Sequence, residues 1–226
     1  MTLRNITLVV HVLVFGMWLG SDVATFLLSR RVLDSSLAVP TRLALARVMG
    51  SIEIIARLCL PTMLASGLVL AINSSLIDLD RRVMLPVVIA AALWISLVWI
   101  IFRQSGEAEL ASRLSMIDLV IRCTICVSVW VVAMVSIVGQ DGPVAAPFLQ
   151  GKLLAFAAIM SAGIAIRVQL RGFAAAFGEL AAAGSTESTE RALQSTLRRA
   201  QPLVGVIWGC LVFATVLAVT KSAPWE

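Results

Sequence analysis

Six long apolar stretches dominate this chain of 226 residues. Each is long enough to cross a bilayer, which takes about 20 consecutive apolar residues in an α-helix. Because only helices and closed barrels satisfy their backbone hydrogen bonds in lipid, these stretches predict membrane-spanning helices. The predicted fold class is all-α, a polytopic integral membrane helix bundle of about six transmembrane helices. We expect the spans at residues 6–28, 51–72, 83–102, 119–139, 147–167 and 203–220.

Charged residues are too few for a soluble domain. They make up 14% of the chain, whereas soluble domains carry about 25%. The longest polar stretch precedes the last span and is too short to enclose a core of its own. We therefore expect a single transmembrane domain over residues 1–226, with a cytoplasmic helical hairpin at about 168–201.

The 18 Lys and Arg residues divide unevenly between the two sides of such a bundle. Twelve lie on the side of the loops that follow the first, third and fifth spans, five lie on the other side, and Arg57 lies inside a span. Because basic residues accumulate in cytoplasmic loops, this bias places both termini outside. The twelve are Arg30, Arg31, Arg42, Arg47, Arg103, Arg113, Arg122, Arg167, Arg171, Arg191, Arg198 and Arg199. The five are Arg4, Arg81, Arg82, Lys152 and Lys221.

This topology predicts a multi-pass protein of a bacterial-type cytoplasmic (inner) membrane, with membrane lipid as a partner. The arginines are split among short loops, with no aromatic residues between them. That distribution argues against a nucleic-acid-binding surface, which would cluster its basic residues on one face.

The first span carries a polar stripe. His11, the only histidine, is followed seven and eleven residues later by Trp18 and Asp22. At about 100° per residue, these three positions fall within roughly 40° of one another on one helix face. Ionisable groups at membrane depth are costly and mark functional sites by default. We therefore expect this stripe to face protein or a cofactor inside the bundle.

His11 has two interpretations. It is a candidate axial ligand to heme iron or a ligand to copper, since imidazole suits both metals. Alternatively, it is hydrogen-bonded within the bundle or wetted near the outer interface. A chain with one histidine cannot supply both axial ligands of a bis-histidine heme. A second ligand would be Met, Lys, water or none.

Two pairs of opposite charges lie near the cytoplasmic ends of the second and fourth spans. Glu53 and Arg57 are four residues apart, as are Asp118 and Arg122, a spacing that places each pair on one helix face. They are either structural pairs with tips that reach the interface or a rim for an anionic group such as a porphyrin propionate. Arg30 and Arg31 would join that rim, because arginine makes bidentate contacts with carboxylates.

Two further features permit a structural or a functional interpretation. Cys123 and Cys126 form a C-x-x-C inside an apolar run, where small thiols pack like alanine or take a redox or metal role. Lys152 opens the fifth span and is either an interface anchor or a functional lysine.

Three segments together resemble a known family. Residues 11–20 read HVLVFGMWLG, residues 57–67 read RLCLPTMLASG and residues 147–154 read PFLQGKLL. In type and order they resemble the HemJ-type membrane protoporphyrinogen oxidases and, more loosely, the CopD-type copper-resistance membrane proteins. Spans 83–102 and 119–139 are additional to that pattern, and Gln150 stands where the oxidases tend to have His.

The resemblance implies a heme b cofactor with His11 as its axial ligand, and Lys152 as a functional lysine. It also implies removal of hydrogen from a porphyrinogen, with electrons passed toward the respiratory chain through a quinone-linked acceptor. In this interpretation Lys152 and Arg30 are the catalytic candidates. Cofactor-binding candidates are His11, Trp18, Asp22, Glu53 and Arg57, and His11 is the metal ligand.

Three functions therefore remain open. The first is a heme-b-binding redox protein, an oxidoreductase of the protoporphyrinogen oxidase type, with a porphyrin as partner. The second is a copper or small-solute transporter, in which Asp22 and Arg57 would line a continuous polar path. The third is a cofactor-free subunit that packs into a homo-oligomer or a larger membrane complex.

Overall fold

The computed structural model describes residues 2–104, 108–139 and 142–222. Within these ranges the chain is a bundle of helices, with one isolated β-bridge between Ile77 and Val144. Six helical segments are long and apolar enough to cross a membrane. The predicted all-α polytopic bundle is thus confirmed. The helices are α1 Leu3–Val32, α2 Val39–Asn73, α3 Met84–Arg103, α4 Ala108–Val138, α5 Pro147–Gln169, α6 Phe173–Ala183 and α7 Glu187–Thr220, with short 3-10 turns at Arg81–Val83 and Leu170–Gly172.

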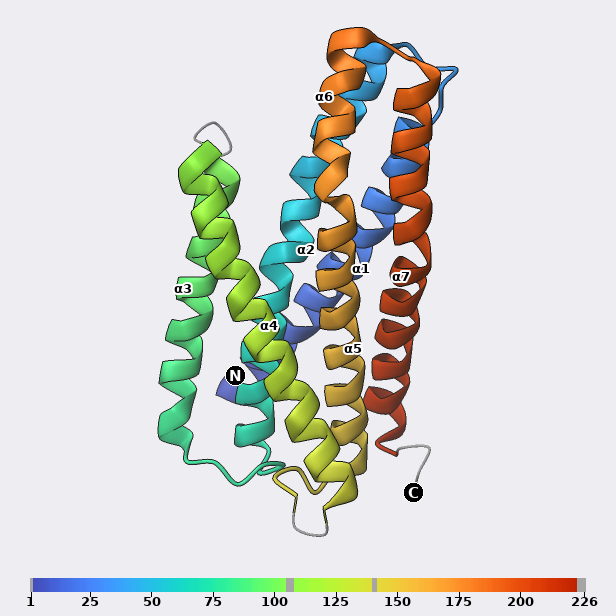
Figure 1. The fold of residues 1–226 in the computed structure, drawn as a ribbon. Helices are drawn as coiled ribbons and strands as arrows, with labels where there is room; N and C mark the ends of the chain where they lie inside the picture. Colours follow the sequence, from blue (N-terminus) through green and yellow to red (C-terminus); the bar gives the residue numbers. More distant parts are fainter. Residues whose placement is uncertain (1, 105–107, 140–141, 223–226) are drawn as a thin grey trace.

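Successive long helices alternate in direction, and the start of α1 and the end of α7 lie toward the same end of the bundle (Figure 1). Helices α1, α2, α5 and α7 form the body, while α3 and α4 stand to one side of it. Helix α6 continues beyond α5 at the opposite end from the termini and packs on the start of α7. We refer to that end as the α6 end.

Several helices are longer than the spans expected from hydropathy. The spans expected to begin at residues 51 and 203 are parts of α2 and α7, which run through these points without a break. Helix α4 likewise begins at Ala108 within the expected connector. The added stretches are rich in Ala, Leu and Arg, which are strong helix formers. At about 1.5 Å per residue, the 34 residues of α7 exceed a hydrocarbon core of about 30 Å, so its first turns extend beyond the lipid.

The surface of the bundle suits lipid. Large apolar side chains such as Leu13, Leu93 and Val131 are more than half exposed along the outer faces of α1, α3 and α4. Buried residues from six helices form one central cluster, which includes Trp18, Leu60 and Trp94.

A buried arginine ties the α6 end together. Arg42 has no exposed surface, and its Nε donates to the Val32 carbonyl at 2.8 Å. Its two terminal nitrogens donate to Glu190 Oε1 at 2.5 Å and Oε2 at 3.0 Å. This bidentate pair joins the start of α2 to the first turns of α7, which lie beyond the expected span. The Arg42 hydrogen bonds hold the pKa of Glu190 below its usual range.

Candidate functional site

A cavity of about 460 Å³ lies inside the bundle between α1, α2, α5 and α7. Its volume is within the range of about 300–1,000 Å³ that is typical of small-molecule sites. Trp18, Leu60, Ile159 and Ile207 close one end, and all four side chains are buried. We call these four residues the floor. Toward the α6 end the lining includes the exposed Gln201 and the buried Leu197 and Ala200.

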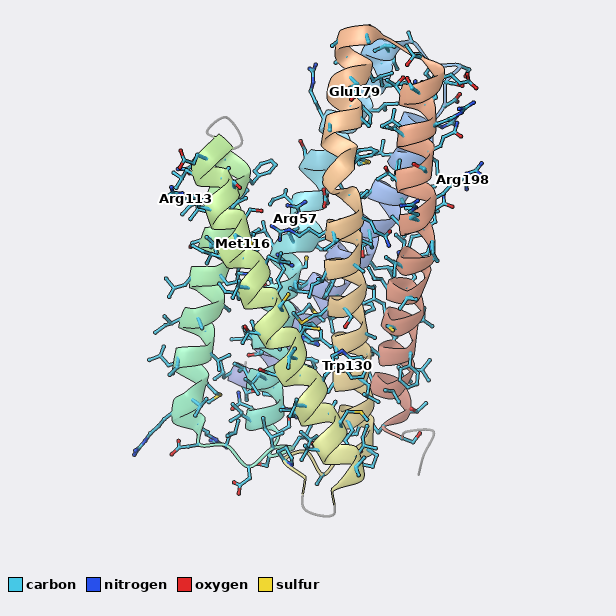
Figure 2. All side chains as sticks on the ribbon, in the orientation of Figure 1. Arg57, Arg113, Met116, Trp130, Glu179 and Arg198 are labelled. Carbon is cyan, nitrogen blue, oxygen red and sulfur yellow. The ribbon has the colours of Figure 1, made fainter. Side chains whose placement is uncertain are left out.

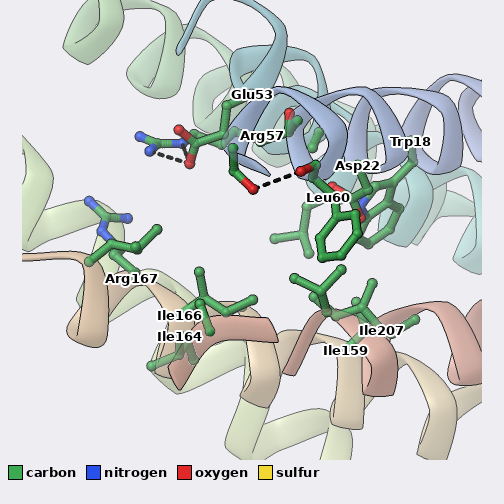
Figure 3. Close-up of a pocket in the computed structure, with 18 of the residues that line it drawn as sticks. Trp18, Asp22, Glu53, Arg57, Leu60, Ile159, Ile164, Ile166, Arg167 and Ile207 are labelled. Carbon is green, nitrogen blue, oxygen red and sulfur yellow. Dashed lines mark hydrogen bonds and ion pairs between the residues drawn. The ribbon is translucent and has the colours of Figure 1, made fainter. Parts of the chain in front are cut away.

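The floor is an apolar layer. The Trp18 ring meets the Phe156 ring edge-on, with centroids 6.4 Å apart and planes at 85°. Figure 3 shows Trp18, Ile159 and Ile207 gathered at one end of the cavity, with Arg57 and Arg167 at the other. A solute that reached the cavity from the α6 end would therefore have to pass this layer to cross the bundle.

Five ionisable side chains line the cavity: Asp22, Glu53, Arg57, Arg122 and Arg167. The predicted pair on α2 is confirmed, because Arg57 donates to Glu53 Oε1 from Nη2 at 2.7 Å and from Nε at 3.2 Å (Figure 3). Both side chains are about 40% exposed, so the pair lies where water or a ligand can reach it.

The predicted pair on α4 is also confirmed, within a larger cluster around Asp118. Its Oδ2 accepts from Arg122 Nε at 2.9 Å and from Arg167 Nη1 at 2.5 Å. Its Oδ1 accepts from the Trp94 indole at 2.8 Å. Arg167 also donates from Nη2 to the Ser115 hydroxyl at 2.6 Å. This cluster joins α3, α4 and α5, and in it two guanidinium groups share one carboxylate.

Arg122 keeps unused donors. Its Nε is bound to Asp118, and its guanidinium lies 5.5 Å from the centre of the Trp94 ring. Its Nη2 is buried, and among the described residues it has no hydrogen-bond partner. Buried charged donors are costly to leave unpaired. Arg122 is also among the residues that line the cavity.

Asp22 is a carboxylate without a cationic partner in the described part of the chain. Glu53 and Asp118 are both paired, whereas no described Lys or Arg lies within ion-pairing distance of Asp22. It lies one helical turn above Trp18, and the neighbouring Thr25 hydroxyl is also buried without a partner among the described residues. An unpaired ionisable group inside a membrane bundle is a functional-site candidate.

His11 lies apart from this cavity. Its Nδ1 is 2.8 Å from the Ser66 hydroxyl on α2, and that hydroxyl donates to the Thr62 carbonyl at 2.6 Å. A hydroxyl has one proton to give, so Ser66 accepts from Nδ1–H and the Nε2 lone pair is left free. The described residues lining the cavity do not include His11, which is about two helical turns from Trp18.

The two catalytic candidates lie at opposite ends of the bundle. Arg30 is in the last turn of α1, 6.0 Å from the centre of the Phe26 ring. Lys152 is in the first turns of α5, where it and Lys221 lie 5.5 and 5.0 Å from the centre of the Phe148 ring. The structure therefore does not bring Arg30 and Lys152 into one site, and neither is among the residues that line the cavity.

Other positions take structural roles. Gln150 is buried and donates to the Ser136 and Val144 carbonyls, both at 2.9 Å, which fixes the turn between α4 and α5. Cys123 and Cys126 are free thiols, the first exposed and the second buried near Ser161. Among the described residues there is no group of three or more His, Cys, Asp and Glu side chains that would hold a metal ion.

Of the predicted site residues, the structure collects Trp18, Asp22, Glu53 and Arg57 around one cavity. Sequence reasoning missed Arg167 and Gln201 as lining residues. Arg167 ends an apolar span, which is a usable signal for a partly buried charge, whereas nothing in the sequence marks Ser66 as the partner of His11.

Comparisons with protein-family models, curated proteins and solved structures give no match to this chain. The resemblance to the oxidase and copper-resistance families therefore stays a prediction, based on the three segments quoted above.

Proposed function

We propose that this chain is a membrane permease for a small solute, and that the cavity between α1, α2, α5 and α7 is its binding site. The observation that carries the proposal is that Asp22 and Arg57, from different helices, line one intramembrane cavity. The heme prediction needs these two residues together with His11, which is not among the residues that line the cavity, whereas the transporter needs only Asp22 and Arg57 there. The loop charges favour a cytoplasmic position for the α6 end and an inner-membrane location.

Two helices that border the cavity contain an internal proline, and these prolines support the proposal of a path through the floor. Pro61 lies inside α2 directly after Leu60 of the floor, and Pro202 lies inside α7 next to Gln201. An internal proline removes one helical hydrogen bond and permits a bend at that point. Bends at these two positions would move floor side chains from both helices, which is how a permease would open the cavity toward the other side.

The floor residues supply a direct test. We expect Trp18→Ala to connect the cavity to the opposite side of the membrane, because the removed indole contacts both Phe156 and the cavity. Proteoliposomes with this variant should swell faster in isotonic xylitol than those with the wild-type chain. The matched control is Trp99→Ala, since Trp99 is 43% exposed on α3, away from the cavity. Equal swelling rates for Trp18→Ala and wild type would contradict a path through the floor.

A second candidate function, heme b binding, is favoured by the free Nε2 of His11. A hydrogen bond that fixes the tautomer through Nδ1 is the usual support of a metal-ligating histidine, and Ser66 accepts that bond here. Bound heme would supply one-electron chemistry. However, the His11 ring and the cavity are separate, so a porphyrin seated in the cavity does not fit His11 as its axial ligand. A visible spectrum of the purified protein decides the question.

A further inference from the structure

We propose that the solute is a small amphiphilic monoanion whose oxyanion group is bound by Arg122. This inference rests on the proposed function, since it assigns a chemical class to the solute of that same cavity.

Arg122 is the arginine of the cavity that has a buried donor without a partner among the described residues. Arg57 donates to Glu53 from two nitrogens, and Arg167 donates from its two terminal nitrogens to Asp118 and Ser115. Among the described residues Arg122 donates a hydrogen bond only from Nε, to Asp118, and its buried Nη2 has no partner there. A carboxylate or another oxyanion accepts from the planar arginine fork in a bidentate manner, which a hydroxyl or amide cannot match.

The charges around Arg122 favour one negative charge on the solute. Arg122 and Arg167 together carry two positive charges, and Asp118 between them carries one negative charge. The Glu53–Arg57 pair is neutral as a unit. One oxyanion would therefore neutralise the α4–α5 side of the cavity. A second negative charge at the other end of the solute would meet Asp22, which has no cationic partner among the described residues.

The residues at the floor end of the cavity indicate what the rest of the solute is like. Leu60, Ile159, Met160 and Ile207 are buried and apolar, and they line the cavity beyond Asp22. Apolar surface that leaves water against such walls is stabilised by about 25 cal/mol per Å². The solute that fits has an oxyanion at the arginine end and an apolar body that points to the floor.

Isothermal titration of the purified chain in lipid nanodiscs tests this inference, with empty nanodiscs as the reference for partitioning of the probe into lipid. The probes are 2-naphthoate, its neutral isostere 2-naphthamide and the dianion naphthalene-2,6-dicarboxylate. We expect 2-naphthoate to bind more tightly than either of the others. The Asp22→Asn variant should recover binding of the dianion, because it removes the acidic group that a second carboxylate of the probe would meet next to the floor.

Variants of Arg122 locate the oxyanion. Arg122→Gln should weaken 2-naphthoate by about tenfold to a hundredfold, the value of hydrogen bonds to a charged group, and leave 2-naphthamide unchanged. Arg122→Lys keeps the positive charge beside Asp118, so this variant should fold. It should lose only part of the affinity for 2-naphthoate, which separates loss of binding from a folding defect. Arg113→Gln is the matched control, because Arg113 is on the same helix in an exposed pair with Glu109.

The outcomes separate the two proposals. Equal affinity for 2-naphthoate and 2-naphthamide, or an unchanged 2-naphthoate affinity in Arg122→Gln, would overturn the monoanion inference and leave the permease proposal in place. Absence of binding for all three probes would overturn the inference as well, and the swelling of the Trp18→Ala proteoliposomes would then decide the proposed function independently.

Discussion

Replacing Glu190 with alanine should destabilise the protein through the arginine that it leaves behind. Arg42 has no exposed surface, and Glu190 accepts from both of its terminal nitrogens, at 2.5 and 3.0 Å. Removing one partner of a buried ion pair costs about 3–5 kcal/mol, because the remaining charge stays buried. Since Arg42 Nε keeps its hydrogen bond to the Val32 carbonyl, we expect the free energy of unfolding to fall by about 3 kcal/mol, the lower end of that range.

The assay is equilibrium unfolding of the detergent-solubilised protein, followed by circular dichroism. The double variant Arg42→Met with Glu190→Leu should recover most of the loss, since replacing both members of a buried pair with apolar residues is often neutral. Arg191→Ala is the control, because Arg191 pairs with Glu187 on the exposed face of the same helix. A loss in Glu190→Ala no larger than in this control would refute the reasoning.

The same pair predicts a pH dependence. Its hydrogen bonds lower the folded-state pKa of Glu190 below the ordinary 4.5. A carboxyl with a depressed pKa contributes stability that is present above its unfolded pKa and is lost as the pH falls through the folded pKa. Wild type should therefore lose stability on acidification below about pH 4.5 more steeply than the double variant does. Parallel pH profiles for the two proteins would contradict the role assigned to the pair.

Three further predictions concern the cavity and His11. Asp118→Asn should lower the free energy of unfolding by about 3–5 kcal/mol in the same assay, because two guanidinium groups lose their shared carboxylate. A change below about 1 kcal/mol would show that the cluster is solvated like an exposed pair. Gly163→Trp should abolish binding of 2-naphthoate in titration without loss of fold, since a Cβ at Gly163 meets open space in the cavity, whereas Gly209→Trp, equally unobstructed but outside the lining, should bind normally. If heme is bound through His11, then His11→Ala should remove the Soret band, and a colourless wild-type protein from heme-replete cells would contradict the heme prediction.

The bundle could be predicted from the sequence because apolar length alone decides whether a segment stays in lipid. The local charge pairs could also be predicted, since a spacing of four residues fixes neighbours on a helix whatever surrounds it. Arg167 could not be joined to Asp118 in this way. The two residues are 49 positions apart, and only the packing of α4 on α5 brings them together.

The polar stripe on α1 shows where helix periodicity stops being informative. It correctly placed Trp18 and Asp22 on the face that lines the cavity. It did not reveal that the neighbour of this face changes along the helix, so that His11 packs on α2 through Ser66 while Trp18 meets Phe156 of α5. Direction on a helix is set by sequence, but the partner at each level is set by how the neighbouring helices cross.

Side-resolved cysteine labelling tests the permease most directly. The native Cys59, Cys123, Cys126 and Cys210 would be replaced by alanine, and Gly163→Cys introduced into that background. A membrane-impermeant maleimide is then added to vesicles of each orientation, with Gly209→Cys as the lipid-facing control. We predict fast labelling of Cys at position 163 from the α6 end, slower labelling from the opposite side as the floor opens, and little labelling at position 209. Labelling of position 163 from the α6 end alone would contradict alternating access, and labelling from neither side would contradict the cavity as a solute site.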